Sequence, residues 1–338
     1  MTDKRVRPGS GGDKYVPYEE RVGGESAVFF TKELSEEGLK RVFARIGSVL
    51  QGKIAVKLHT GEPYGPNIIP RPWVRALLED CLPAARIVET NSYYDGDRYT
   101  TEKHRRTLET NGWNFAPVDI LDENGFVYFP ITGGKWFAEM AVGKNLADYD
   151  SLLALTHFKG HVKGGFGGSN KNLGIGCADG RVGKAMIHTT PNQSNQWDIS
   201  NEEFMERMTE STKSVVDHFA GRIAYINVMR NMSVSCDCEG VYAAPVVTPD
   251  IGILASLDIA ALDQACVDLI YALPDKAGGA LRERIESRRA LRQLTYMQVL
   301  GMGNLKYRLI DTDNNDREVS AAEAVKGIEP FWKPDRWN

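Results

Sequence analysis

The 338-residue sequence has no apolar run long enough to cross a bilayer, and its first residues lack the apolar core of a signal peptide. It also has no surplus of positive charge, because 45 Asp and Glu residues outnumber 41 Lys and Arg residues and give a net charge of −4. Non-specific binding to nucleic acid or to an anionic membrane needs such a surplus. We therefore expect a cytoplasmic protein with no nucleic-acid partner and no membrane partner; an oligomer is compatible with the sequence.

Cysteine is scarce as well. The five cysteines are too few and too scattered for a disulfide framework, and they lack the repeated CxxC spacing of ferredoxin-type iron–sulfur modules. Cys81 and Cys266 fall within amphipathic helical patterns, which favours a place in the core. The remaining thiols are Cys177, Cys236 and Cys238.

The apolar residues recur with alternating strand and helix periodicities. Residues 35–50 have helical spacing with Ser35 as a cap, and residues 53–58 are typical of a strand buried on both faces. The alternation continues with strands predicted over residues 150–156, 222–229 and 250–258 and helices over residues 202–221 and 259–273. Short turns between such elements predict an α/β fold with a mostly parallel sheet, covered by helices on both faces and built from two β/α halves.

Composition divides the chain into four parts. Residues 1–25 are basic and poor in aliphatic side chains, which predicts a flexible tail. Residues 26–150 form the first β/α half and residues 151–312 the second, which carries the most unusual polar motifs. Residues 313–338 are predicted to be a C-terminal tail.

Polar clusters directly follow several predicted strands. They are HTGEP (59–63), TNSYYDGDR (90–98), HFKGH (157–161) and SCDCEG (235–240). The carboxyl ends of parallel strands share one edge of a sheet, where ligands collect in α/β proteins. We therefore expect a site at that edge, with Glu62 and Asn91 among its polar candidates and with Ser256 and Asp258 nearby.

The densest of these clusters, residues 156–188, combines histidine, lysine and glycine. Glycines allow backbone amides to face a phosphate or carboxylate group without obstruction by Cβ. Lys171 and Lys184 are predicted to supply the counter-charge. The predicted ligand-binding residues of this block are Gly164, Gly165, Gly167, Gly168, Asn172 and Lys184. They predict a site for a small anionic molecule.

Two histidines in the same block are candidates for proton transfer. His157 and His161 are four residues apart, so they share a side both in a helix and in an extended segment. Neighbouring lysines are expected to favour their neutral forms, which can accept a proton from substrate. We predict His157, His161 and Lys171 as the catalytic residues, whereas His188 is predicted to be structural.

The Cys-Asp-Cys motif is the second constellation. Cys236 and Cys238 could place two thiolates on one soft metal ion or on a cluster iron, with Cys177 as a further ligand. The alternative is that both are small, semi-buried thiols at a strand end, with Asp237 turned toward water. A metal ion or an iron–sulfur cluster therefore stays open as a cofactor.

The motif set resembles the family catalogued as domain of unknown function 362. The resemblance is carried by KLHTGEP, ETN at residues 89–91, HFKGHxxGGFGGxxKNxGIG, CDC and DIGILAS with ALDQACVDLI, and it covers essentially all of the chain after the tail. Many relatives are labelled iron–sulfur proteins because they carry a ferredoxin module, so that label does not transfer to this chain. The glycine block is also similar to one segment of nickel-dependent lactate racemases, which implies a catalytic histidine just upstream of it.

Three hypotheses about function follow, in descending rank. The first is an enzyme that binds a small anionic metabolite and uses histidines for acid–base chemistry, such as isomerisation or racemisation. The second is a metal or iron–sulfur protein with Cys236 and Cys238 as ligands. The third is a non-catalytic module that binds a partner through the basic tail and the glycine loop.

Overall fold

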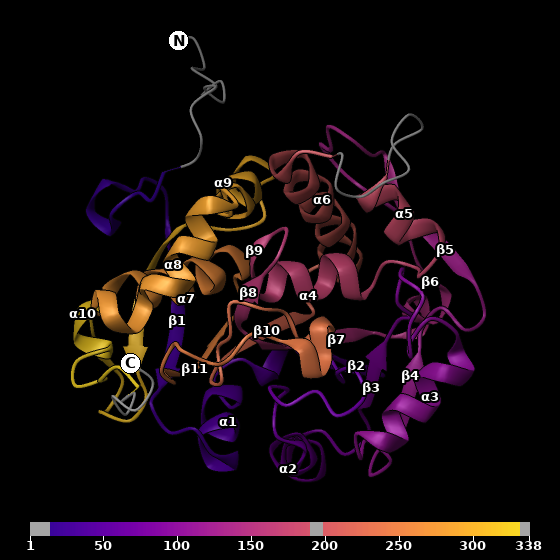
Figure 1. The fold of residues 1–338 in the computed structure, drawn as a ribbon, viewed down its shortest axis with the longest axis horizontal. Coiled ribbons are helices and arrows are strands. Elements are labelled where there is room, and N and C mark those ends of the chain that lie inside the picture. The colour runs from indigo at the N-terminus through magenta and orange to yellow at the C-terminus, as the bar shows by residue number, and fades with distance from the viewer. Residues whose placement is uncertain (1–13, 190–198, 332–338) are drawn as a thin grey trace, which may run out of the picture.

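The central strands are apolar runs that are buried on both faces. Every residue of β7 (Ser151–His157) and β10 (Ile223–Met229) is buried. The computed structural model describes residues 14–189 and 199–331, and these form a nine-stranded sheet with helices on either side (Figure 1). The strand order is β13 (Arg317–Glu318), β12 (Lys306–Asp311), β1 (Glu25–Thr31), β11 (Gly252–Ser256), β10, β7, β2 (Ile54–Lys57), β3 (Arg86–Glu89) and β4 (Val118–Ile120).

The sheet is mostly parallel, as the sequence predicts. Strands β10, β7, β2, β3 and β4 pair in parallel, and so do β1 and β12. Strand β11 is antiparallel to both of its neighbours. Strand β1 belongs to the first predicted half and yet pairs with β11 and β12 of the second, so both halves build one sheet.

The direction of β11 corrects one expectation. Ser256 and Asp258 were expected at the edge where the parallel strands end, but β11 runs the opposite way and ends at the other edge. There Asp258 caps helix α7 by accepting a hydrogen bond from the Ala261 N–H. The expectation was wrong because strand polarity depends on pairing, which an apolar run does not encode.

Two layers of helices cover the sheet (Figure 1). Alternate residues of β7 face opposite layers, since Leu152 and Ala154 join one apolar cluster and Leu153 and Leu155 the other. One layer contains α1 (Glu36–Phe43), α2 (Arg71–Cys81) and α3 (Thr101–Thr110). The other contains α4 (Ser169–Gly176), α5 (Val182–His188), α6 (Asn201–Phe219), α7 (Ile259–Ala272), α8 (Asp275–Ser287), α9 (Arg292–Val299) and α10 (Ala321–Ala324).

Two short antiparallel pairs complete the fold. Strands β5 (Phe126–Pro130) and β6 (Glu139–Gly143) form an antiparallel hairpin, and the sequence predicts its first arm from the apolar run 126–131 that follows the turn-rich residues 122–125. Strands β8 (Lys159–His161) and β9 (Gly165–Gly167) lie between β7 and α4. The remaining helical elements are the 3-10 turns η1 (Tyr18–Glu20), η2 (Gly47–Val49), η3 (Lys144–Asp148) and η4 (Asp237–Tyr242). Within the described ranges, no helix combines the length and apolar character needed to span a membrane.

The described part of the predicted N-terminal tail is packed against the helices. Arg21 donates two hydrogen bonds of 2.6 Å to the carboxylate of Asp268 in α7, and both side chains are at most 4% exposed. Tyr15 stacks on Tyr271 with ring centroids 4.1 Å apart. Residues 14–24 therefore differ from the flexible segment expected from composition, because Arg21 pairs with a buried carboxylate and Tyr15 packs on a half-buried ring.

Replacing Arg21 tests whether this segment belongs to the folded unit. Arg21→Ala leaves the Asp268 carboxylate buried without its cation, so we expect the free energy of unfolding to fall by about 3–5 kcal/mol in urea denaturation. The control is Arg308→Ala, which breaks an exposed ion pair with Glu318 and should cost at most about 1 kcal/mol. Equal, small losses in both variants would contradict an integral role for residues 14–24.

Candidate functional site

A cavity of about 180 Å³ lies at the edge of the sheet where the parallel strands end. Lys57 and Glu89, the last residues of β2 and β3, line it, and Lys159 lines it just after β7. Helix α4 begins at the same edge, because the chain turns back through the β8–β9 hairpin. The cavity therefore occupies the edge at which the sequence predicts a ligand site.

Cationic side chains dominate the polar part of the cavity wall. They come from strand ends, loops and helices that lie far apart in the sequence. The cationic residues are Lys57, Arg98, Lys159, Lys163, Lys171 and Lys184, and the single carboxylate among the lining residues is Glu89.

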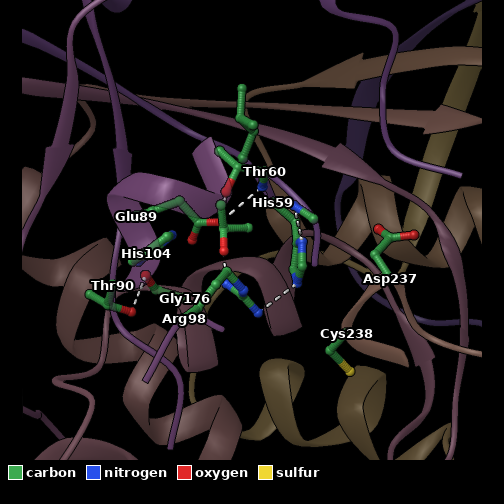
Figure 2. A network of polar contacts seen from close by, with 12 residues as sticks. His59, Thr60, Glu89, Thr90, Arg98, His104, Gly176, Asp237 and Cys238 are labelled. Atoms are coloured by element: carbon green, nitrogen blue, oxygen red, sulfur yellow. Dashed lines mark hydrogen bonds and ion pairs between the residues drawn. The ribbon is translucent and has the colours of Figure 1, made fainter. Parts of the chain in front are cut away.

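The Glu89 carboxylate organises one side of the cavity. It lies 2.9 Å from Lys57 Nζ and 3.7 Å from Arg98 Nη1, and it accepts hydrogen bonds from the backbone and side chain of Thr60. Figure 2 shows Arg98 between Glu89 and His59, whose Nε2 is 3.3 Å from Arg98 Nη2. These cations hold the pKa of the buried Glu89 well below its usual value against the opposing effect of burial.

The predicted polar residues Glu62 and Asn91 accept hydrogen bonds from cationic side chains of this wall. Glu62 accepts a 2.8 Å hydrogen bond from Arg98 Nε. The backbone oxygen of Asn91 accepts a hydrogen bond from Lys184 Nζ, while its side chain contacts Thr101. Neither residue is among those that line the cavity, so each contributes to its wall only through its cationic partner.

Lys184 stands apart from the other cations. Its Nζ donates to Thr90 Oγ1 at 2.7 Å and to the Asn91 carbonyl, both of which are neutral oxygens. Among the described residues it forms no salt bridge, although the carboxylates of Asp122 and Glu89 act on it from a greater distance. Burial lowers the pKa of Lys184 to about 8, because the charged form loses its hydration.

The glycine block folds as a hairpin and a helix start rather than as an open phosphate loop. Gly167 and Gly168 line the cavity, whereas Gly164 and Gly165 do not. The first amides of α4, those of Ser169 and Asn170, donate to the buried carboxylate of Asp263 at 2.8 and 2.9 Å. These amides are thus engaged by an internal anion.

Close packing explains two of these glycines. A Cβ on Gly168 would stand 2.4 Å from Asp263 Oδ1. Gly165 has a φ of +75°, and a Cβ there would stand 2.3 Å from the Cβ of Ala290. Asp263 of α7 therefore positions the block.

His157 and His161 lie in different environments. His157 Nδ1 is 2.9 Å from Asp237 Oδ1 and Nε2 is 2.7 Å from the Arg230 carbonyl oxygen. Both partners are acceptors, so both contacts form only when both ring nitrogens carry a proton. His157 is buried, is not among the cavity-lining residues and fixes Asp237.

His161 lines the cavity and has the opposite pattern. Its Nδ1 accepts a 2.8 Å hydrogen bond from the Gly164 N–H. Burial lowers its pKa well below the usual value, and the charge of Lys171 adds to this effect. The ring is therefore neutral, and its proton resides on Nε2.

Sequence comparison identifies the family. The model of the family described as domain of unknown function (DUF362) matches residues 54–268, well over half of the chain. The chain belongs to the DUF362 family. The matched range contains every candidate site residue described above.

The similar solved structures include the following two. The lactate racemase apoprotein from Thermoanaerobacterium thermosaccharolyticum is 12% identical, with a TM-score of 0.39, over 88% of this chain and 85% of that one. A structural-genomics protein from Thermotoga maritima is 12% identical, with a TM-score of 0.34, over 57% of this chain and 50% of that one. No curated protein matches the sequence.

The DUF362 chain brings two of its predicted thiols together near His161. One ring nitrogen of His161 and the sulfurs of Cys236 and Cys238 lie within 4.8 Å of one another. Cys177 ends helix α4 instead, and burial raises its thiol pKa to about 12. Among the described residues, the group that could hold a metal ion does not include it.

The Asp237 carboxylate fixes the Cys-Asp-Cys segment of the DUF362 chain. It lies 2.9 Å from Lys159 Nζ as well as from His157. Asp237 is buried, unlike the alternative in which it faces water. Figure 2 shows Cys238 beside Asp237.

The pKa values of the two thiols shift in opposite directions. A hydrogen bond from Cys238 lowers the pKa of Cys236, with Lys171 contributing through a 3.5 Å contact between Nζ and Sγ. The same hydrogen bond raises the pKa of Cys238. Cys236 is therefore the thiolate and Cys238, which lines the cavity, is its proton donor.

Two further predicted residues have defined places. Asn172 lines the cavity, and its Nδ2 donates to Thr156 Oγ1 at 2.9 Å while its Oδ1 accepts from Lys57 Nζ at 3.2 Å. Lys171 lines it beside Cys236. Both belong to α4, which directs one helical face of the predicted block to the cavity.

The sequence did not single out several residues of this wall. Lys57 had a signal, since a lysine interrupts a run predicted to be buried on both faces, and it is only 1% exposed. Arg98 and Lys159 lie in polar clusters that follow predicted strands, but nothing in those clusters identifies Glu89 and Asp237 as their partners. The ion pairs at this edge of the sheet therefore could not be predicted from the sequence.

The thiol pair of the DUF362 chain generates a spectroscopic prediction. Because the pKa of Cys236 is lowered, thiolate absorbance at 240 nm should persist well below pH ~8.5, the value of a free cysteine, and vanish as pH falls further. Lys171→Met should move this transition upward, since it removes a stabilising cation. Cys236→Ser should abolish the transition, whereas Cys266→Ser, which removes a thiol buried in α7, should leave it unchanged. A transition that survives Cys236→Ser would refute the assignment.

Proposed function

We propose that the chain is an enzyme that binds a small anionic molecule in the cavity at the sheet edge and transfers a proton to or from it. The observation that carries this proposal is the excess of cationic side chains on the cavity wall. Lys57, Arg98, Lys159, Lys163, Lys171 and Lys184 face the cavity, and Glu89 is the one carboxylate among the described residues that line it.

Internal partners offset only part of this positive charge. Glu89 pairs with Lys57, Glu62 with Arg98 and Asp237 with Lys159. The Cys236 thiolate faces Lys171. Lys184 donates to neutral oxygens and feels the carboxylates of Asp122 and Glu89 only from a distance, so a bound carboxylate or phosphate would supply a direct counter-charge to its buried ammonium group.

His161 supports proton-transfer chemistry as a hydrogen-bond donor. Its neutral ring presents Nε2–H, because Nδ1 is occupied by the Gly164 amide. A neutral imidazole N–H stabilises negative charge that develops on a substrate oxygen, and the effect is strongest where water is excluded. His161 is 9% exposed, which satisfies that condition.

Lys184 provides the direct test of anion binding. Lys184→Met should weaken the binding of phosphate and of small carboxylates at least tenfold in calorimetric titrations, a loss of about 1.4 kcal/mol or more. The control is Lys276→Met, at an exposed position of α8, which should bind like the parent. Equal affinity in parent and Lys184→Met would exclude this cavity as the anion site.

The lowered pKa of Lys184 adds a pH signature. Because its pKa is about 8, the ammonium form predominates below that pH and is lost above it. Anion affinity of the parent should therefore fall as pH rises from 7 to 9. Lys184→Arg keeps its charge over this range, so its affinity should stay level, and a parallel fall in both proteins would point to another titrating group.

A metal ion is the second candidate ligand of this site. The observation that favours it is the clustering of His161, Cys236 and Cys238, whose ligand atoms lie within 4.8 Å of one another. Two sulfurs and an imidazole suit a soft or borderline ion. Against it stands the Gly164 N–H, which already occupies Nδ1 of His161 and leaves the proton on Nε2.

Elemental analysis separates the two candidates. If a metal is bound, protein purified without oxygen should contain it stoichiometrically, and Cys236→Ser and Cys238→Ser should each remove it because two thiolates are the core ligands. Cys81→Ser, in α2, should retain the metal. Metal that persists in the Cys236→Ser, Cys238→Ser double variant would exclude this cluster as the site.

A further inference from the structure

His188, predicted to be structural, lines the same cavity as His161. It is the last residue of α5, one helical turn after Lys184. Its ring stacks on Tyr93 with centroids 5.5 Å apart and an interplanar angle of 17°. On another side Phe204 packs at 5.2 Å with a tilt of 57°. Two aromatic neighbours therefore hold the imidazole in one orientation.

The hydrogen bond of His188 determines which ring nitrogen carries the proton. Nδ1 lies 2.8 Å from the carbonyl oxygen of Lys184. A carbonyl oxygen only accepts, so Nδ1 carries the proton. Burial lowers the pKa of His188 to about 4, so the ring is neutral at pH 7. Nε2 then has a free lone pair on a residue that lines the cavity.

His161 and His188 are thus complementary. Both rings pack near Phe204, with centroid distances of 6.3 and 5.2 Å. His161 carries its proton on Nε2 because a backbone amide occupies Nδ1, while His188 carries its proton on Nδ1 because a backbone carbonyl occupies that atom. One neutral ring is a donor at Nε2 and the other is an acceptor.

We infer that His188 Nε2 is the proton acceptor of this cavity and that the substrate is a small carboxylate with a C–H bond next to a carbonyl group. This inference rests on the proposed function. The carboxylate pairs with Lys184, whose backbone oxygen fixes the His188 ring one turn further along α5. The carbonyl oxygen accepts a hydrogen bond from His161 Nε2–H.

The proton transfer balances without a further reactant. The C–H bond breaks, its proton moves to His188 Nε2, and the electron pair passes into the carbonyl group to give an enolate. His161 Nε2–H and the lysines stabilise the enolate oxygen. If the imidazolium proton is replaced by one from solvent before His188 returns a proton to the same carbon, the result is an exchange; return to a different face or atom of the enolate gives an isomerisation. A bound carboxylate also favours the imidazolium, because it adds the negative charge that the buried ring otherwise lacks.

Hydrogen–deuterium exchange into two simple 2-oxo acids tests the inference. Pyruvate and 2-oxobutyrate are incubated with the protein in D₂O, and loss of their C-3 proton signals is followed by NMR. Glutamine at position 188 accepts a hydrogen bond but cannot hold a proton, so His188→Gln should slow the catalysed exchange by ~10²-fold or more. Calorimetric affinity for the same acids should change little. His188→Asn is the second variant if the glutamine substitution prevents folding.

His218→Gln is the matched control, since His218 in α6 stacks on Phe129 and is not among the cavity-lining residues. It should exchange at the parent rate. Parent-rate exchange by His188→Gln would overturn the role of His188, and so would a parent protein that binds these acids but exchanges neither. A parent that binds no anion at all would instead overturn the proposed function, which keeps the two failures distinct.

Discussion

The candidate site depends on the buried carboxylate of Asp237. It stands between two cysteines in the sequence, and His157 and Lys159 hold it from the end of β7. Because the carboxylate cannot turn to solvent, the thiols on either side of it are fixed: Cys236 faces Lys171, and Cys238 lines the cavity. One ion-paired side chain thereby couples the central strand to α4 and to the thiol pair.

The three histidines His157, His161 and His188 differ in their buried hydrogen-bond partners. His157 contacts two acceptors, whereas His161 contacts an amide donor and His188 a carbonyl. Burial keeps the last two neutral. Hydrogen bonds to backbone groups therefore determine the tautomers of His161 and His188. Which ring nitrogen can donate or accept a proton thus depends on the backbone conformation around each histidine.

Local pattern was enough to predict the mostly parallel sheet, the Ser35 cap, the 126–131 hairpin and the edge at which a cavity forms. These features follow from periodicity and from the common polarity of parallel strands. The direction of β11 and the packing of Arg21 on Asp268 depend on distant partners, which no local pattern encodes. The sequence also treated His157 and His161 as a pair, whereas the end of β7 and the β8–β9 hairpin direct them to different surroundings.

The glycine block at residues 164–168 shows that a sequence motif does not by itself fix which group its backbone amides bind. The block resembles an anion loop, yet the first amides of α4 bind Asp263, a carboxylate of the protein itself. The positive potential of the helix start is therefore used to pack α4 against α7. The positive charge at the cavity therefore resides on lysine side chains, among them Lys184, whose pKa burial lowers to about 8. An anion in the cavity would raise that pKa, so near pH 8 anion binding and proton uptake would be linked at this lysine rather than at the glycines or the thiols.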